Sequence, residues 1–88
     1  MIDIAARFGD NLARQRKGAD ISQEELGLRA SLHRTEISQL ERGLRIARID
    51  TLVKIRDALE VSADDLLDGI SWRSGDYRPG RFMAEGED

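Results

Sequence analysis

The feature that most constrains the fold of this chain is a set of helix start and stop signals in the middle of its sequence. Ser22-Gln-Glu-Glu25 is a capping box, in which the serine hydroxyl accepts an amide proton three residues on and the glutamate reaches back. It predicts a short helix that continues to Ala30. A second short helix is expected over residues 34–42, because Gly43 after it accepts the left-handed conformation easily. Two helices this short need tertiary packing to be stable.

Helical signals continue on both sides of this pair. Apolar residues recur at four-residue spacing from Ile4 onward, which predicts an amphipathic helix ending at residues 16–18. Asp50 is the expected N-cap of a fourth helix, and Ser62-Ala-Asp-Asp65 is a second capping box that begins a fifth. No segment alternates with period two, so strands are not expected. The prediction is an all-α five-helix bundle over residues 1–69.

The last part of the chain, residues 70–88, has a different character. It is rich in glycine and holds the only proline, Pro79. Trp72, Tyr77 and Phe82 are five apart, a spacing that fits neither a helix nor a strand. We therefore expect an extended or irregular, partly flexible arm, frayed beyond about Phe82, whose aromatic side chains fold back over the core. A dimer contact and a cover for a small ligand are the alternatives.

Composition excludes several classes of function. The 88 residues contain no cysteine and one histidine, His33, so we expect neither disulfides nor a metal site. No nucleophile elbow or phosphate-binding loop is present, and we therefore expect no catalytic residues, no cofactor and no enzyme activity. No apolar run is long enough for a membrane span, and the first residues are charged. A cytoplasmic protein with no membrane contact is the expectation.

The net charge of −3 argues against a nucleic-acid partner, but its distribution does not. Residues 29–48 carry five arginines and two acids, a local charge of +3, whereas acids gather over residues 57–68 and 85–88. A basic stripe on an acidic body is compatible with DNA binding.

The middle pair of helices meets the geometric requirements of a helix-turn-helix. Gly27 is small enough for a close helix crossing, and Ser31 occupies the turn. Apolar residues are available to lock the helices together: Leu26, Ala30, Leu32, Ile37 and Leu40. The outward positions of the second helix carry polar side chains that can reach base edges: Arg34, Thr35, Ser38 and Gln39.

Residues 4–68 resemble the XRE family of phage-repressor-like transcription regulators. The resemblance is carried by Ile21-Ser-Gln-Glu-Glu-Leu and, at the right spacing, Ile37-Ser-Gln-Leu-Glu-Arg-Gly43. It continues through Asp50-Thr-Leu and Leu59-Glu-Val-Ser. It implies a phage-repressor-like five-helix fold and a regulator that binds double-stranded DNA with residues 33–42 as the recognition helix.

The resemblance also implies roles for single residues. Base reading falls to the face formed by Arg34, Thr35, Ser38 and Gln39. Phosphate contacts fall to Gln23 and Arg42, with Arg45 and His33 added on chemical grounds. A structural ion pair is implied between Arg16 and Glu41. Four positions depart from the family pattern. Ser31 replaces the usual turn glycine, Glu36 puts an acid near the DNA face and Ala47 replaces a frequent loop proline. His33 stands where serine or threonine caps, so we expect a weaker or water-mediated cap.

One recognition helix reads few base pairs, so a homodimer on a pseudo-palindromic site is expected. Its surface is predicted to involve Leu66, Leu67 and Ile70, or the arm. The alternative function is a protein-interaction module, an antitoxin or a coactivator-like bridge, that uses the same bundle.

Overall fold

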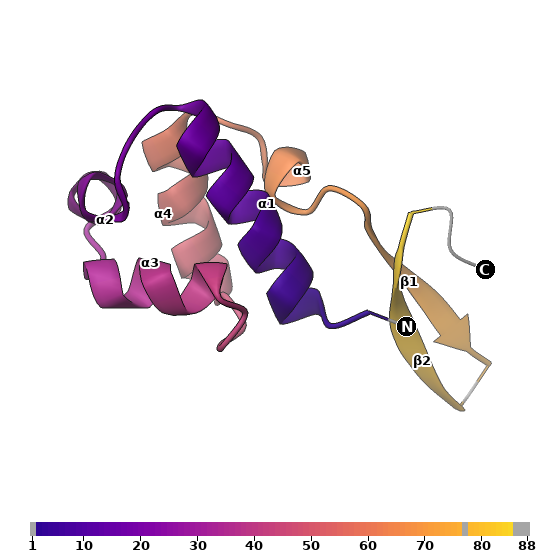
Figure 1. Cartoon of the computed structure of the whole chain (residues 1–88). Helices are drawn as coiled ribbons and strands as arrows, with labels where there is room; N and C mark the ends of the chain where they lie inside the picture. The colour runs from indigo at the N-terminus through magenta and orange to yellow at the C-terminus, as the bar shows by residue number, and fades with distance from the viewer. Residues whose placement is uncertain (1, 77, 86–88) are drawn as a thin grey trace.

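The computed structural model describes residues 2–76 and 78–85. Five helices are followed by a two-stranded antiparallel hairpin (Figure 1). The elements are α1 (Ile4–Gly18), α2 (Gln23–Ala30), α3 (Arg34–Glu41), α4 (Ile49–Leu59), α5 (Ala63–Leu66), β1 (Ile70–Gly75) and β2 (Arg78–Ala84). The five predicted helices are present, but the two strands show that the protein is not all-α.

The core lies between the helices and is almost entirely aliphatic. Each helix turns its apolar stripe inward, because burying that stripe is what stabilises helices of this length. The buried cluster consists of Phe8, Leu12, Leu26, Ile37, Leu40, Ile55, Leu59 and Leu66. Leu66 is fully buried in this core, so its predicted place on a dimer surface is wrong.

Local capping explains most helix boundaries. At α2 only the serine half of the predicted capping box forms, because the Glu25 carboxylate pairs with Arg29 and not with the Ser22 amide. At α5 the Ser62 hydroxyl accepts from the Asp65 amide at 3.0 Å, and the Asp65 carboxylate accepts from the Ser62 amide at 3.0 Å, as the capping box predicts. The predicted N-cap of α4, Asp50, was wrong. Its N-cap is Arg48, without a side-chain cap, and Asp50 lies in the first turn. There its carboxylate pairs with Arg48 at 3.3 Å. Its negative charge also interacts favourably with the positive, N-terminal end of the helix dipole.

The C-terminal arm is not irregular, as its composition suggested, but forms the hairpin of β1 and β2. Trp72 pairs with Phe82 across the strands, their rings meeting edge to face with centroids 5.1 Å apart. Gly80 lies so close to the Trp72 ring that an added Cβ would be 2.2 Å from it. The aromatic residues therefore pair across the strands, which their spacing along the chain does not reveal. Fraying was predicted beyond Phe82, but β2 continues to Ala84 with Met83 buried. Tyr77 and residues 86–88 lie outside the described residues.

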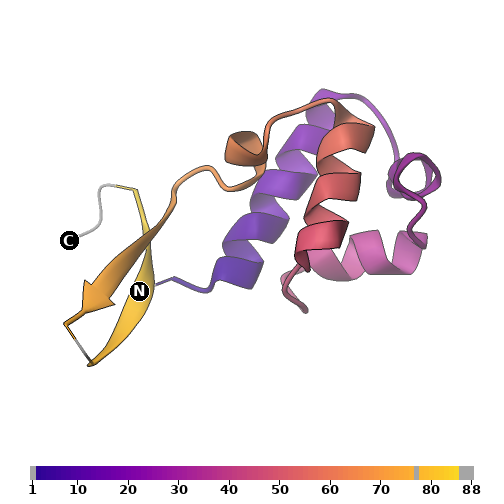
Figure 2. The same cartoon turned by 180° about the vertical axis from the view of Figure 1, so that it is seen from behind.

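Backbone contacts join the hairpin to the helices. Ile2 donates to the Phe82 carbonyl at 3.1 Å, and Glu85 donates to the Gly69 carbonyl at 2.8 Å. Met83 is buried, whereas Trp72 is 58% exposed and so does not fold back over the core. The hairpin lies at the end of the molecule opposite α2 (Figures 1 and 2). Among the described residues, no helix has the length and apolar character that a membrane span requires.

Candidate nucleic-acid interface

The turn between α2 and α3 holds the two helices at a close crossing. Ser31 adopts the left-handed conformation at φ 57°, which a non-glycine residue adopts with some strain. A Cβ on Gly27 would lie 2.6 Å from the Leu32 carbonyl oxygen, so only glycine allows the chain to pass this closely. The apolar side chains predicted to lock the helices are buried or half-buried there.

His33 caps α3 directly, and not through water, which was one of the two expectations. Its Nδ1 accepts the amide proton of Thr35 at 3.0 Å. Imidazole can accept at Nδ1 only when this nitrogen carries no proton, so the neutral ring holds its proton on Nε2. That N–H donor lies at the exposed start of α3, a position from which it can reach an anion.

The polar residues of α3 lie on its outer side. Arg34 and Thr35 are exposed and Ser38 and Gln39 are half-buried, whereas Ile37 and Leu40 on the opposite side are fully buried. We call Arg34, Thr35, Ser38 and Gln39 the reading face. The structure places all four on one continuous surface, because residues at i, i+1, i+4 and i+5 share one side of a helix.

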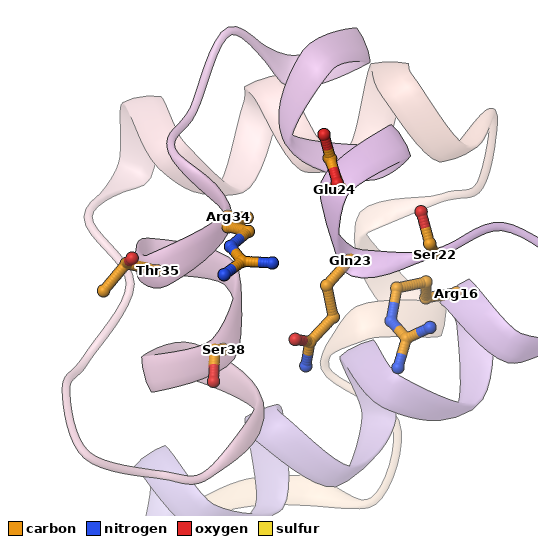
Figure 3. Close-up of a pocket in the computed structure, with 7 residues that line it drawn as sticks. All are labelled: Arg16, Ser22, Gln23, Glu24, Arg34, Thr35 and Ser38. Atoms are coloured by element: carbon orange, nitrogen blue, oxygen red, sulfur yellow. The ribbon is translucent and has the colours of Figure 1, made fainter.

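An open hollow separates the start of α2 from the start of α3. Arg34, Thr35 and Ser38 line it from α3, and it is completed by Arg16, Ser22, Gln23 and Glu24. Figure 3 shows the Arg34 guanidinium pointing toward Gln23, with Thr35 directed away from them. The fold thus brings Gln23, a phosphate candidate, opposite a base-reading candidate from the other helix.

A network of hydrogen bonds supports the floor of this region. Arg16 forms a two-pronged ion pair with Glu41, at 2.6 Å from Nε and 3.0 Å from Nη2. The hydrogen bond to Glu41 is the main cause that raises the pKa of Arg16, against the opposing effect of burial. Gln23 Nε2 also donates to Glu41, at 3.1 Å, a contact that sequence reasoning missed. One N–H of the Gln23 amide is therefore already used, and the other remains for a ligand.

The remaining phosphate candidates differ in their surroundings. Arg42 is exposed at the end of α3, and its side chain has no hydrogen-bond or ion-pair partner within the described residues. Arg45 donates from Nη1 to Gln39 Oε1 at 3.2 Å, which joins a phosphate candidate to the reading face. No sequence signal identified this pair, because the two side chains meet only after the chain has turned at Gly43. In the described part of the chain no group of acidic and histidine side chains is arranged to hold a metal.

Comparison with known proteins identifies the family of this chain. The profile of the helix-turn-helix family HTH_3 matches residues 12–66, more than half of the chain. The chain belongs to this family. It is an XRE-type, DNA-binding transcription regulator, as its sequence motifs indicated.

Individual relatives agree with the assignment. Control protein C.BamHI of Bacillus amyloliquefaciens is 42% identical over 67 residues, which span 75% of this chain and 83% of the relative. The restriction-modification controller protein C.AhdI of Aeromonas hydrophila superposes with a TM-score of 0.69 at 29% identity, over 70% of this chain and 94% of that one. The P22 c2 repressor in complex with a synthetic operator superposes with a TM-score of 0.63 at 30% identity, over 67% of this chain and 89% of the repressor chain.

Proposed function

We propose that this protein binds specific sites in double-stranded DNA by inserting α3 into the major groove. The observation that carries the proposal is the reading face, an outward polar surface on a helix whose opposite side is locked into the core. Side chains of Arg and Gln at such positions can make paired hydrogen bonds to base edges, and Ser and Thr can make single ones. The protein acts in this proposal by binding and not by catalysis.

Phosphate contacts surround the reading face on both sides. Gln23 and His33 present N–H donors at the starts of α2 and α3, and Arg42 presents an unpaired cation at the end of α3. Contacts of this kind set the register of the protein on the duplex without reading sequence. The P22 c2 repressor, whose fold this chain shares, has been crystallised with an operator, which supports the same docking here.

The test begins with selection from random duplexes at moderate salt, followed by fluorescence anisotropy on the selected site. Arg34→Ala should weaken binding about 5- to 150-fold and relax preference at one base pair, because one base contact contributes about 1–3 kcal/mol. Arg42→Ala should weaken binding of all sequences alike and reduce the salt slope by about one. Arg56→Ala, on α4 and paired with Asp57, is the matched control and should bind normally. Failure to enrich any sequence would favour the protein-interaction alternative.

We propose further that the protein binds as a homodimer on a pseudo-palindromic site. An apolar groove lies between α1, the start of α4 and the hairpin, lined by Ile4, Ala5, Phe8, Ile46, Ala47, Ile49, Leu52, Leu67, Ile70 and Phe82. Ile46 and Ile49 are 64% and 80% exposed, an unusual state for isoleucine that marks an interaction surface. Ile46 lies in the loop between α3 and α4, and Ile49 is the first residue of α4, so a second copy seated there would hold two recognition helices in one dimer, as paired half-sites require. Leu67 and Ile70 from the predicted dimer surface line this groove, whereas Leu66 does not.

The oligomeric state decides this part of the proposal. Sedimentation of the wild type should show a dimer, and Ile49→Asp should sediment as a folded monomer because this side chain contributes little to the core. Leu28→Asp is the matched control, since Leu28 is 72% exposed on α2 and lies outside the groove. A monomeric wild type at high concentration would refute the dimer.

A further inference from the structure

The chain turns back on α3 in a defined way after Gly43. Gly43 has φ 70° and donates to the Leu40 carbonyl at 3.1 Å, and Leu44 donates to the Gln39 carbonyl at 3.0 Å. This pair of bonds is the Schellman arrangement that ends many helices. A Cβ on Gly43 would lie 2.8 Å from the backbone of α1, so the turn is also held in place from the other side. The backbone thereby returns Arg45 to the last turn of α3.

The contact that results is the hydrogen bond from Arg45 Nη1 to Gln39 Oε1 at 3.2 Å. Arginine carries only donors, so the Gln39 amide must turn its oxygen, and not its NH2 group, toward the guanidinium. Bonds that involve a charged group are about twice as strong as neutral ones, which favours this orientation over a freely rotating amide. Gln39 is left with its two N–H donors for any other partner.

This orientation changes what Gln39 can recognise in a major groove. A free glutamine reads adenine by accepting from N6 while it donates to N7. Arg45 engages one of the two lone pairs of Oε1, and its positive charge beside this oxygen repels the N6 donor of adenine, so the accepting half of that pair is disfavoured. Guanine presents two neighbouring acceptors, N7 and O6, and no donor on its major-groove edge, so it suits an amide that offers donors only.

We propose that Arg45 sets the base preference of Gln39 by engaging its oxygen, so that Gln39 selects guanine and rejects adenine. Arg45 is a positioning residue in this role, since it acts on the base through Gln39. Its guanidinium has further N–H groups, so a simultaneous phosphate contact is compatible with the bond to Gln39. The inference rests on the proposed function, because it assigns a preference to one residue of the reading face.

The test compares base preferences of four proteins selected on random duplexes: the wild type, Gln39→Ala, Arg45→Ala and Arg42→Ala. The position at which Gln39→Ala loses preference identifies the base pair that Gln39 reads. There the wild type should favour guanine over adenine by about 5- to 150-fold, the discrimination typical of one good base contact. Arg45→Ala should lower this ratio at least tenfold or reverse it toward adenine. Arg42→Ala, which also removes one cation near the end of α3, should weaken binding without changing the ratio.

Two results would overturn the inference while the proposed function stands. One is a wild type that prefers any base other than guanine at the Gln39 position. The other is an Arg45→Ala protein that binds more weakly with an unchanged preference, which would make Arg45 a phosphate contact only. A wild type that selects no sequence would instead refute the proposed function, and the inference with it.

Discussion

The ion pair between Arg16 and Glu41 offers the sharpest test of how this domain is held together. Arg16→Met removes the cation at nearly constant volume and leaves the Glu41 carboxylate with Gln23 as its remaining described partner. Glu41→Met removes the acid. The double variant replaces both charged groups by apolar ones, so the three proteins and the wild type form a double-mutant cycle.

The magnitude follows from burial and geometry. The Arg16 and Glu41 side chains are 12% and 6% exposed, and two hydrogen bonds of 2.6 and 3.0 Å join them. Removing one partner of a buried pair costs about 3–5 kcal/mol, because the other charge stays desolvated. We expect Arg16→Met to destabilise by about 3 kcal/mol, which lowers the Tm of a domain this size by about 12–24 °C. The coupling energy should be about 2–3 kcal/mol, so the double variant should lose that much less stability than the sum of the two single variants.

Urea unfolding followed by far-ultraviolet circular dichroism measures these energies through the helices; fluorescence of the exposed Trp72 does not report on the core. Arg16 also donates to the Ile21 carbonyl at 2.9 Å, but this bond is lost in both Arg16 variants and cancels in the cycle. The matched control is the pair of Arg29 with Glu25, which is 47% and 43% exposed and should couple by about 0.3–0.5 kcal/mol.

Two results would refute this reasoning. A coupling energy no larger than that of the exposed control pair would show that burial does not strengthen the Arg16–Glu41 contact. A coupling that weakens between pH 6 and 9 would contradict the raised pKa of Arg16. A group whose pKa is raised on folding stabilises fully below its unfolded pKa, and loses that effect only as the pH rises through the folded value. For arginine both values lie far above neutral pH.

Three further predictions concern packing and backbone. Gly9→Ala should destabilise by about 1–3 kcal/mol in urea titration, because its Cβ would lie 2.4 Å from the Leu40 carbonyl oxygen of α3. Gly18→Ala is the control: an added Cβ there has nothing within 4 Å, so this variant should be neutral or stabilising. Asn11→Ala should lower the free energy of unfolding by about 1–3 kcal/mol, since this fully buried amide donates to two carbonyl oxygens at and just beyond the end of α5. A smaller loss than that of an exposed polar residue would contradict its role in holding α5 against α1. Ser31→Gly should raise stability by up to about 1 kcal/mol, because glycine relieves the strain of the left-handed conformation at φ 57°, and operator affinity should stay unchanged. A drop in stability would show that the serine side chain stabilises the fold by more than this strain costs.

The helices of this protein could be predicted from its sequence because their signals are local. A capping hydroxyl and its amide lie three residues apart, as at Ser22 and Ser62, and the glycine that ends α3 acts within one turn. The outward direction of Arg34 and Thr35 follows from the same periodicity that buries Ile37. The family motifs added the pairing of Arg16 with Glu41, which spacing alone did not indicate.

Tertiary structure decided the features that join distant parts of the chain. The hairpin depends on Trp72 meeting Phe82 across two strands, and glycine-rich composition concealed that pairing. Full burial of Leu66 depends on packing against the other helices. From sequence alone this apolar residue could be assigned equally to the core or to a dimer surface, and the dimer surface was the wrong choice. The contact of Arg45 with Gln39 exists only because Gly43 reverses the chain beside α1. Sequence by itself determined that each helix forms and which side it turns to the core, since those interactions span a few residues, but it misplaced the start of α4. The bond of Arg45 to Gln39 on the reading face arises from a contact between elements, which no local pattern records.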